Sequence, residues 1–449
     1  MKVLKKIGLS LLWISFALPA AAMDPFGVYE QRDEPSCRTK SLSEPLDLWE
    51  VMEIAVCQNP SLKVSYLATK VSGAEYGQSL AAYLPSLDGT ASLTQSNTKV
   101  DGGTSDDQTD VGASLSLNWL LLDFGGRSAT ADQFKAYLTS AYYTYDNSLQ
   151  TLLYNVAESF FSVLSAEENY EGLLESEKAS QKAYEEASSR FNLGLVPLSD
   201  KLQAETAYAQ AKLSSTVAQK EIAIQRGNLA HLMNLPPYTP LKLNRRDEKI
   251  QDTENVDEIE KLIEKALANR PDYKARELAK KAAELDIEIA RSDGLPTLSA
   301  NAGAGVGDDL RQGRDTKYNS SAGLRLSVPI FTGFQQSYKI GQAVYQYEQA
   351  QNELTSLKNT IENEVWAAVQ DYKTSFRTHT ISQTLLKSAE ESERVAFASY
   401  KVGRVNILTL LDAQAQLAEA RIEFSTSFYN FLIAKNNLMR VLGQMEARS

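Results

Sequence analysis

Residues 190–203 read RFNLGLVPLSDKLQ, and residues 399–412 read SYKVGRVNILTLLD. Both stretches place an aromatic residue three positions before a glycine, and an apolar run that contains an aspartate follows the glycine. A glycine at such a place is typical of a helix that ends in a left-handed cap, and Pro197 suits the first turn of a following helix. Each stretch therefore predicts the turn of a helical hairpin, and the chain contains this turn twice.

Further matching segments flank the two turns at offsets of 209 to 211 residues. AVCQNPSLKVSYLATK from residue 55 resembles ALANRPDYKARELAKK from residue 266, and a Leu-Pro-x-Leu motif begins at residues 84 and 295. Chance would not keep this spacing over most of the chain, so the protein consists of two copies of one unit. The segments that we predict are a first repeat (46–235), a linker (236–270), a second repeat (271–443), an N-terminal segment (23–45) and a C-terminal tail (444–449).

Each repeat contains two segments in which apolar and small polar residues alternate. They lie at 86–93, 111–119, 298–306 and 321–330. A period of two predicts strands with one apolar and one polar face, which fits either a sheet on a soluble core or an outer-membrane barrel. The small, uniform faces and the strand length of roughly 10 residues favour the barrel. Four strands cannot close a barrel, so membrane strands would require oligomerisation.

Long helices are predicted between the strands and the turns. Residues 128–190 contain no proline and one glycine, and their apolar residues step by three and four, as in a coiled coil. Such a helix would be about 95 Å long. Residues 335–400 repeat the pattern, and shorter helices are predicted over 46–82, 197–233 and 257–268.

The N-terminus predicts export. Lys2, Lys5 and Lys6 precede the apolar stretch IGLSLLWISFALP and a run of three alanines, which is typical of a signal peptide over residues 1–22 rather than of a short membrane anchor. In an exported chain, Cys37 and Cys57 favour a disulfide over a metal site. The formal net charge of −11 argues against a nucleic-acid partner. We find no nucleotide loop, metal cluster or nucleophile–His–acid set, so we expect no enzyme activity and no cofactor.

The signal peptide, the tandem repeats, the alternating strands and the paired turns together resemble the TolC-like outer-membrane efflux protein family over about residues 42–443. The resemblance implies a mixed α/β homotrimer, in which each chain gives four strands to a shared twelve-stranded barrel that continues into a helical periplasmic tunnel. It further implies a passive exit duct in the outer membrane of a Gram-negative bacterium, serving tripartite efflux or type I secretion. The partners would be a periplasmic adaptor and an inner-membrane transporter. The alternative is a structural or adhesive coiled-coil protein of the outer membrane.

The same resemblance implies a gate at the hairpin tips, built from aspartates and a tyrosine–arginine network. Thr409 stands where a second ring aspartate would be, and Val405 stands where the linking arginine would be, with Arg404 adjacent. The other positions that match the gate are Ser199, Asp200, Tyr400 and Asp412, and the residues implied to dock the adaptor are Gly194, Leu195, Val196, Gly403 and Val405. Both acids could instead compensate a helix dipole, and Tyr400 could be a packing residue.

Overall fold

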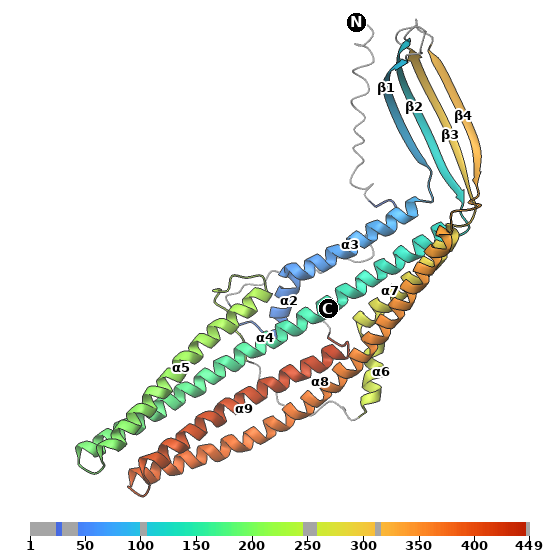
Figure 1. Cartoon of the computed structure of the whole chain (residues 1–449). Coiled ribbons are helices and arrows are strands. Elements are labelled where there is room, and N and C mark those ends of the chain that lie inside the picture. The colour runs from blue at the N-terminus through green and yellow to red at the C-terminus, as the bar shows by residue number, and fades with distance from the viewer. Residues whose placement is uncertain (1–23, 29–43, 99–105, 246–257, 310–315, 446–449) are drawn as a thin grey trace, which may run out of the picture. The chain divides into compact units, whose positions relative to one another are not determined.

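The computed structural model describes residues 24–28, 44–98, 106–245, 258–309 and 316–445 (Figure 1). Two successive sets of elements follow the same order of two helices, two strands and two helices. The first set is α2 (Leu48–Gln58), α3 (Pro60–Ala81), β1 (Ser86–Thr98), β2 (Asp106–Leu122), α4 (Gly126–Asn192) and α5 (Leu198–Leu232). The second set is α6 (Ile259–Asn269), α7 (Pro271–Ser292), β3 (Thr297–Asp309), β4 (Lys317–Ser327), α8 (Gln335–Lys401) and α9 (Ile407–Val441). This order confirms the repeat.

The long helices agree with the prediction. Helices α4 and α8 have 67 residues each, and α5 and α9 have 35 each. At 1.5 Å per residue, α4 and α8 are each about 100 Å long. None of the helices among the described residues has the length and apolarity needed to cross a membrane.

The single helix predicted over 46–82 is wrong. It is two helices, α2 and α3, separated at Asn59, whose backbone is extended with ψ 119°. Pro60 explains the break, because proline has no N–H and disfavours helical geometry in the residue before it. Arg270 and Pro271 separate α6 from α7 in the same way. Helix α6 is thus the counterpart of α2, so the structural repeat begins at α6, before the boundary predicted at residue 271.

The chain forms two compact units, and neither coincides with a repeat. Of the described residues, the first comprises 24–28, 67–98, 106–141, 276–309 and 316–353, and the second comprises 44–66, 142–245, 258–275 and 354–445. Each unit therefore takes segments from both repeats. The sheet belongs to the first unit and both hairpin turns belong to the second.

The sheet is antiparallel, with the order β1-β2-β3-β4. The pairing of β2 with β3 joins the two repeats. The predicted apolar faces coincide across the sheet, since Leu87 lies opposite Leu117, Trp119 opposite Ala300, and Leu298 opposite Leu326. The strands have 13, 17, 13 and 11 residues, longer than the roughly 10 predicted.

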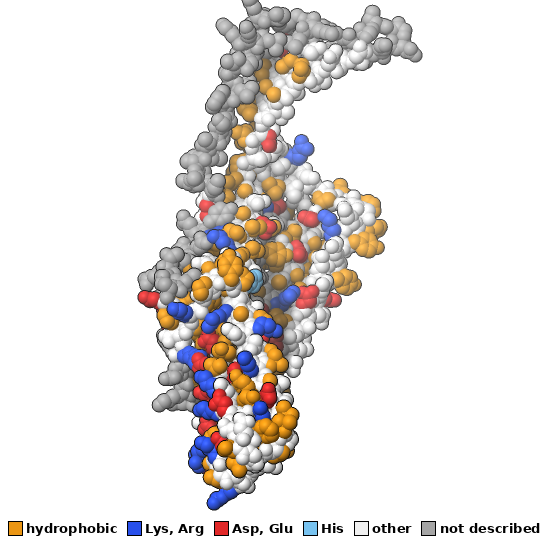
Figure 2. Space-filling view, turned by 90° about the vertical axis from the view of Figure 1, so that its left-hand side faces the viewer, with side chains coloured by type: hydrophobic (Ala, Val, Ile, Leu, Met, Phe, Trp, Pro, Cys, Tyr) orange, Lys and Arg blue, Asp and Glu red, His pale blue; other side chains and the backbone are white. Residues whose placement is uncertain are grey.

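The apolar face of the sheet has no cover within the described part of the chain. Leu87, Leu324 and Leu326 are 68%, 70% and 65% exposed. Figure 2 shows few charged side chains over the strands, at the top of the view, and many over the helices. Outer strands β1 and β4 each have one neighbour in this sheet. As far as the described residues go, the sheet therefore has two open edges and an uncovered apolar face.

The second unit has the larger hydrophobic core. Its most buried aromatic residues include Phe160 on α4, Tyr372 on α8 and Phe431 on α9, all at most 3% exposed. Cys57 lies in α2 and is disulfide-bonded, whereas Cys37 lies outside the described residues, so their pairing stays a prediction. The predicted signal peptide also lies outside the described residues.

Candidate functional site

Both predicted hairpin turns are present, at the same end of the second unit (Figure 1). Gly194 and Gly403 have φ of +71° and +75°, the left-handed conformation predicted for them. The Gly194 N–H donates to the Phe191 carbonyl at 2.9 Å, and the Gly403 N–H donates to the Tyr400 carbonyl at 3.0 Å. The Leu195 N–H donates to the Arg190 carbonyl, and the Arg404 N–H donates to the Ser399 carbonyl, both at 2.9 Å. The two helices thus end in the same Schellman cap.

The two returning helices begin differently. Asn406 caps α9, and its side-chain oxygen accepts from the Thr409 N–H at 3.0 Å and the Thr409 hydroxyl at 2.9 Å. Pro197 holds the corresponding place before α5 and has no side chain that can cap. Asp200 lies in the first turn of α5, where a negative charge compensates the helix dipole. Thr409 therefore belongs to a helix cap that sequence reasoning missed.

The two candidate gate acids differ in exposure. Asp412 is exposed, and its carboxylate accepts from the Gln416 amide at 2.9 Å. Asp200 is half-buried and accepts from the Ser199 hydroxyl at 3.3 Å. The core-facing side chains of α9 near Asp412 are Leu410 and Ala413, so its carboxylate points away from the core.

Tyr400 is a packing residue in this structure. It is 2% exposed, in a cluster that also contains Ala183, Ala187, Ala204, Ala396, Ile407, Leu410 and Ala413. Its hydroxyl is buried and has no hydrogen-bond partner among the described residues. Burial raises the pKa of this hydroxyl, Arg190 opposes the rise, and Asp200 and Glu186 add to it. Within the described residues, Tyr400 therefore takes part in the tip through its ring and main chain, and its hydroxyl makes no hydrogen bond.

Arg190, which sequence reasoning did not single out, contacts Tyr400 instead. Its Nη1 donates a hydrogen bond to the Tyr400 main-chain carbonyl, and its guanidinium carbon lies 5.1 Å from the centre of the Tyr400 ring. The two residues are 210 positions apart, so no local pattern could have paired them.

The surface of the tips carries exposed apolar side chains beside polar and charged ones. Leu193, Leu195 and Val402 are 73%, 64% and 68% exposed, and Arg404 is also exposed. Val196 is half-buried, and so is Val405, which packs against the Tyr400 cluster. The structure thus brings the residues implied for adaptor docking to one end of the unit.

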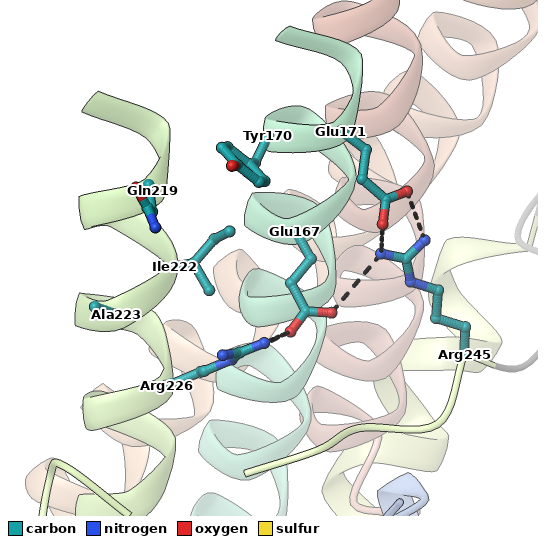
Figure 3. Close-up of a pocket in the computed structure, with 8 residues that line it drawn as sticks. All are labelled: Glu167, Tyr170, Glu171, Gln219, Ile222, Ala223, Arg226 and Arg245. Carbon is teal, nitrogen blue, oxygen red and sulfur yellow. Dashed lines mark hydrogen bonds and ion pairs between the residues drawn. The ribbon is translucent and has the colours of Figure 1, made fainter. Parts of the chain in front are cut away.

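A groove of about 480 Å³ lies between α4 and α5, with Glu167, Tyr170, Glu171, Gln219, Ile222, Ala223, Arg226 and Arg245 around it (Figure 3). Arg226 pairs with Glu167 at 2.6 Å, and Arg245, from the segment after α5, pairs with Glu171 at 2.9 Å and with Glu167 at 3.8 Å. The hydrogen bonds to Glu171 raise the pKa of Arg245. The positive charges of the two arginines balance the negative charges of the two glutamates. The ion pairs of Arg245 attach the start of the linker to α4. Sequence reasoning missed it because its members lie 59 and 74 residues apart.

Among the described residues, no group of three or more His, Cys, Asp or Glu side chains is placed to hold a metal ion. The candidate site therefore consists of the two turns, with their acids, their apolar surface and the Arg190–Tyr400 contact.

Comparison with known proteins places this arrangement among channels. The family described as outer membrane efflux protein matches residues 51–235 and 262–444. Outer membrane protein TolC of Escherichia coli is 27% identical over 421 residues, which cover 90% of this chain and 84% of that protein. Protein CyaE of Bordetella pertussis is 25% identical, with 84% and 80% covered. The Campylobacter jejuni CmeC outer membrane channel matches the fold with a TM-score of 0.76 at 19% identity, covering 90% of this chain and 87% of that one.

Proposed function

Because this chain belongs to the outer membrane efflux protein family, we propose that three copies of it close one twelve-stranded barrel in the outer membrane. The observation that supports this proposal is the sheet of four strands, which in the described part of the chain has two open edges and an uncovered apolar face. Backbone groups at an open edge cannot be satisfied in lipid, and closed barrels begin at eight strands. Three sheets of four strands satisfy every edge and turn the apolar face to lipid.

The chain is an exit duct of the outer membrane for efflux or secretion, and the alternative of an adhesive coiled-coil protein is not favoured. The relatives are outer membrane channel proteins, not enzymes, and we assign the same passive role to this chain. A periplasmic adaptor and an inner-membrane transporter then supply substrate and energy. The exposed apolar residues Leu193, Leu195 and Val402 support docking of the adaptor at the tips, since exposed apolar patches mark interaction sites.

The narrow end of the duct lies at the tips in this proposal. Asp412 points away from the core of its own chain, and three copies around one axis would form a negative ring that favours cations. Asp200 and Ser199 line the neighbouring turn, and Thr409 adds no charge. Asp412→Ala should therefore reduce the cation selectivity of the channel in a planar lipid bilayer.

The control is Glu391→Gln, which removes an exposed acid of α8 that is already paired with Arg394 at 2.6 Å. Its selectivity should equal that of the unaltered protein. Equal selectivity in Asp412→Ala as well would mean that Asp412 is only a solvated helix residue. A purified protein that inserts into the bilayer but never conducts would refute the duct itself.

A further inference from the structure

The two outer strands of the sheet carry opposite charges on the same face. Asp88 is the only charged residue of β1, and Arg325 lies near the end of β4, on the opposite edge (Figure 1). Asp88 lies opposite Ser116 and Arg325 lies opposite Ser299, so both belong to the polar face, and both are exposed. In the described part of the chain neither side chain forms an ion pair or a hydrogen bond. Each charge is therefore left unpaired at an open edge.

The two edges are complementary to each other and not to themselves. The four strands are antiparallel, so β4 of one copy can pair antiparallel with β1 of the next. Opposite charges on neighbouring strands stabilise such a pair, and like charges destabilise it. A contact between two β1 strands would offer no cation to Asp88, because β1 contains none. The charges therefore favour a contact of β4 with β1, which closes a ring.

The apolar alternation alone does not fix the register of this contact. A slip of one residue would turn the polar face to lipid, but a slip of two keeps every side chain on its face. The polar face of β4 contains Ser321 and Gly323, and that of β1 contains Thr90 and Ser92, all small and uncharged. Such residues fit equally well at several registers, whereas the attraction between two charges depends on the distance between them.

The pairing within one chain shows how far Arg325 lies from Asp88 along the strands. Arg325 lies opposite Ser299, and Ser299 lies opposite Leu120. The register of β1 with β2 extends this row of paired residues to position 84, four residues before Asp88. An offset of four residues between one copy and the next would therefore bring Arg325 directly opposite Asp88.

The hand of the sheet gives the direction of the offset. A Cβ at Gly303 would lie 3.6 Å from the Leu115 carbonyl oxygen, so Leu115, on the apolar face, turns its carbonyl toward β3. For L-residues this places β3 to the left of β2 when the apolar face is viewed with the start of β1 at the bottom. Barrel strands rise to the right in a view from outside, because strand twist has one hand. A row that runs from β1 to β4 therefore climbs, and it meets the next copy farther along β1.

The tilt of the strands gives the size of the offset, which must be even to keep the polar face inside. With a rise of about 3.3 Å per residue and a strand spacing of about 4.8 Å, an offset of about four residues over four strands gives a tilt of about 35°, and one of about six gives about 46°. Barrel strands tilt by about 35–45°. The smaller offset places Arg325 opposite Asp88. The larger places it opposite Thr90, diagonal to Asp88 and within reach of a long side chain.

We propose that Arg325 forms an ion pair with Asp88 of the next copy, and that three such pairs set the register in which the barrel closes. The inference rests on the proposed function, since it assumes the trimeric barrel. It adds the pair of residues that joins β4 of each copy to β1 of the next.

The first test measures how fast the full-length trimer dissociates in detergent. Asp88→Asn and Arg325→Gln should each raise the dissociation rate about tenfold, which corresponds to about 1.4 kcal/mol over the three pairs. The two changes together should have no larger effect than either one, because both remove the same pair. The exchange of the charges, Asp88→Arg with Arg325→Asp, should return the rate toward that of the unaltered protein.

Lys317→Gln is the matched control. Lys317 is exposed on the same face of β4, at the other end of the strand, and the two offsets place it opposite Ser96 or Thr98. This variant removes one charge without removing a pair, so its dissociation rate should equal that of the unaltered protein.

The second test determines the register in a protein that keeps both charges. Gly323→Cys is combined in turn with Thr90→Cys, Ser92→Cys and Thr94→Cys. Nothing lies within 4 Å of a Cβ at Gly323, and Cys57 is already disulfide-bonded. Oxidation should join neighbouring copies through residue 90 if the offset is four, or through residue 92 if it is six.

Unchanged dissociation in both single variants, an equal rise in Lys317→Gln, or an exchange of charges that restores nothing would overturn the pair. Cross-linking through residue 94, or through none of the three, would also overturn it, because Arg325 and Asp88 would then be out of reach. If the charge variants do not assemble, the cross-links decide. A particle of one chain in the unaltered protein would instead refute the proposed function.

Discussion

The two cap glycines provide an internal comparison that tests the asymmetry of the tips. Gly194→Ala and Gly403→Ala place the same methyl group at equivalent positions of the same cap, with φ of +71° and +75°. The left-handed conformation costs an L-residue about 1–2 kcal/mol. At Gly194 that is the whole cost, because nothing lies within 4 Å of the new Cβ.

At Gly403 the new Cβ would also lie 3.2 Å from Nη2 of Arg190, so the guanidinium must shift. A hydrogen bond from a charged group contributes about 1.5–3 kcal/mol, and weakening it adds to the backbone cost. Local opening of the turn should therefore become roughly 5- to 30-fold more frequent in Gly194→Ala, and more frequent than that in Gly403→Ala.

Hydrogen exchange with mass spectrometry on the intact trimer measures these openings turn by turn. The Gly403→Ala change should also be made in the Arg190→Ala background, where its excess cost should disappear. Equal acceleration at the two turns, or an excess that persists without Arg190, would refute the reasoning.

Two further predictions concern buried polar groups. Tyr400→Phe removes a buried hydroxyl that has no hydrogen-bond partner in the described chain, so the free energy of unfolding should be unchanged or higher by about 1 kcal/mol. A clear loss of stability in thermal unfolding would mean that the hydroxyl is hydrogen-bonded in the assembled protein. The ring centre of His379 lies 5.2 Å from that of Phe424 and 5.6 Å from that of Phe428, and partial burial lowers the pKa of His379 from the ordinary 6.5. The unfolded chain then binds the extra proton first, so stability should fall as pH drops below about 6.5. His379→Gln should flatten this dependence in melting curves, and an unchanged slope would contradict the assignment.

The sequence predicted the features that depend on local pattern. The glycine turns, the long uninterrupted helices and the alternating strands each have a short-range physical cause, and the constant offset between copies reinforced them. The predicted apolar faces also coincide across the sheet, because directly paired residues of neighbouring strands point to the same face.

The features that sequence reasoning missed have other causes. The break at Asn59 was not predicted, because the helical pattern of the sequence continues on both sides of Pro60. The first helix nevertheless ends there, before the proline. The strands extend beyond the alternating segments because backbone pairing continues through polar residues such as Gln95 and Asn97. The contact of Arg190 with Tyr400 depends on how two hairpins pack, and neither stretch alone contains that information.

The mass of the detergent-solubilised protein tests the central claim most directly. The open-edged sheet predicts that light scattering, corrected for bound detergent, finds three chains in each particle, with strands that resist unfolding as long as the particle is intact. A stable particle of one chain with folded strands would contradict the account, because its four strands would then satisfy their edges without a closed barrel.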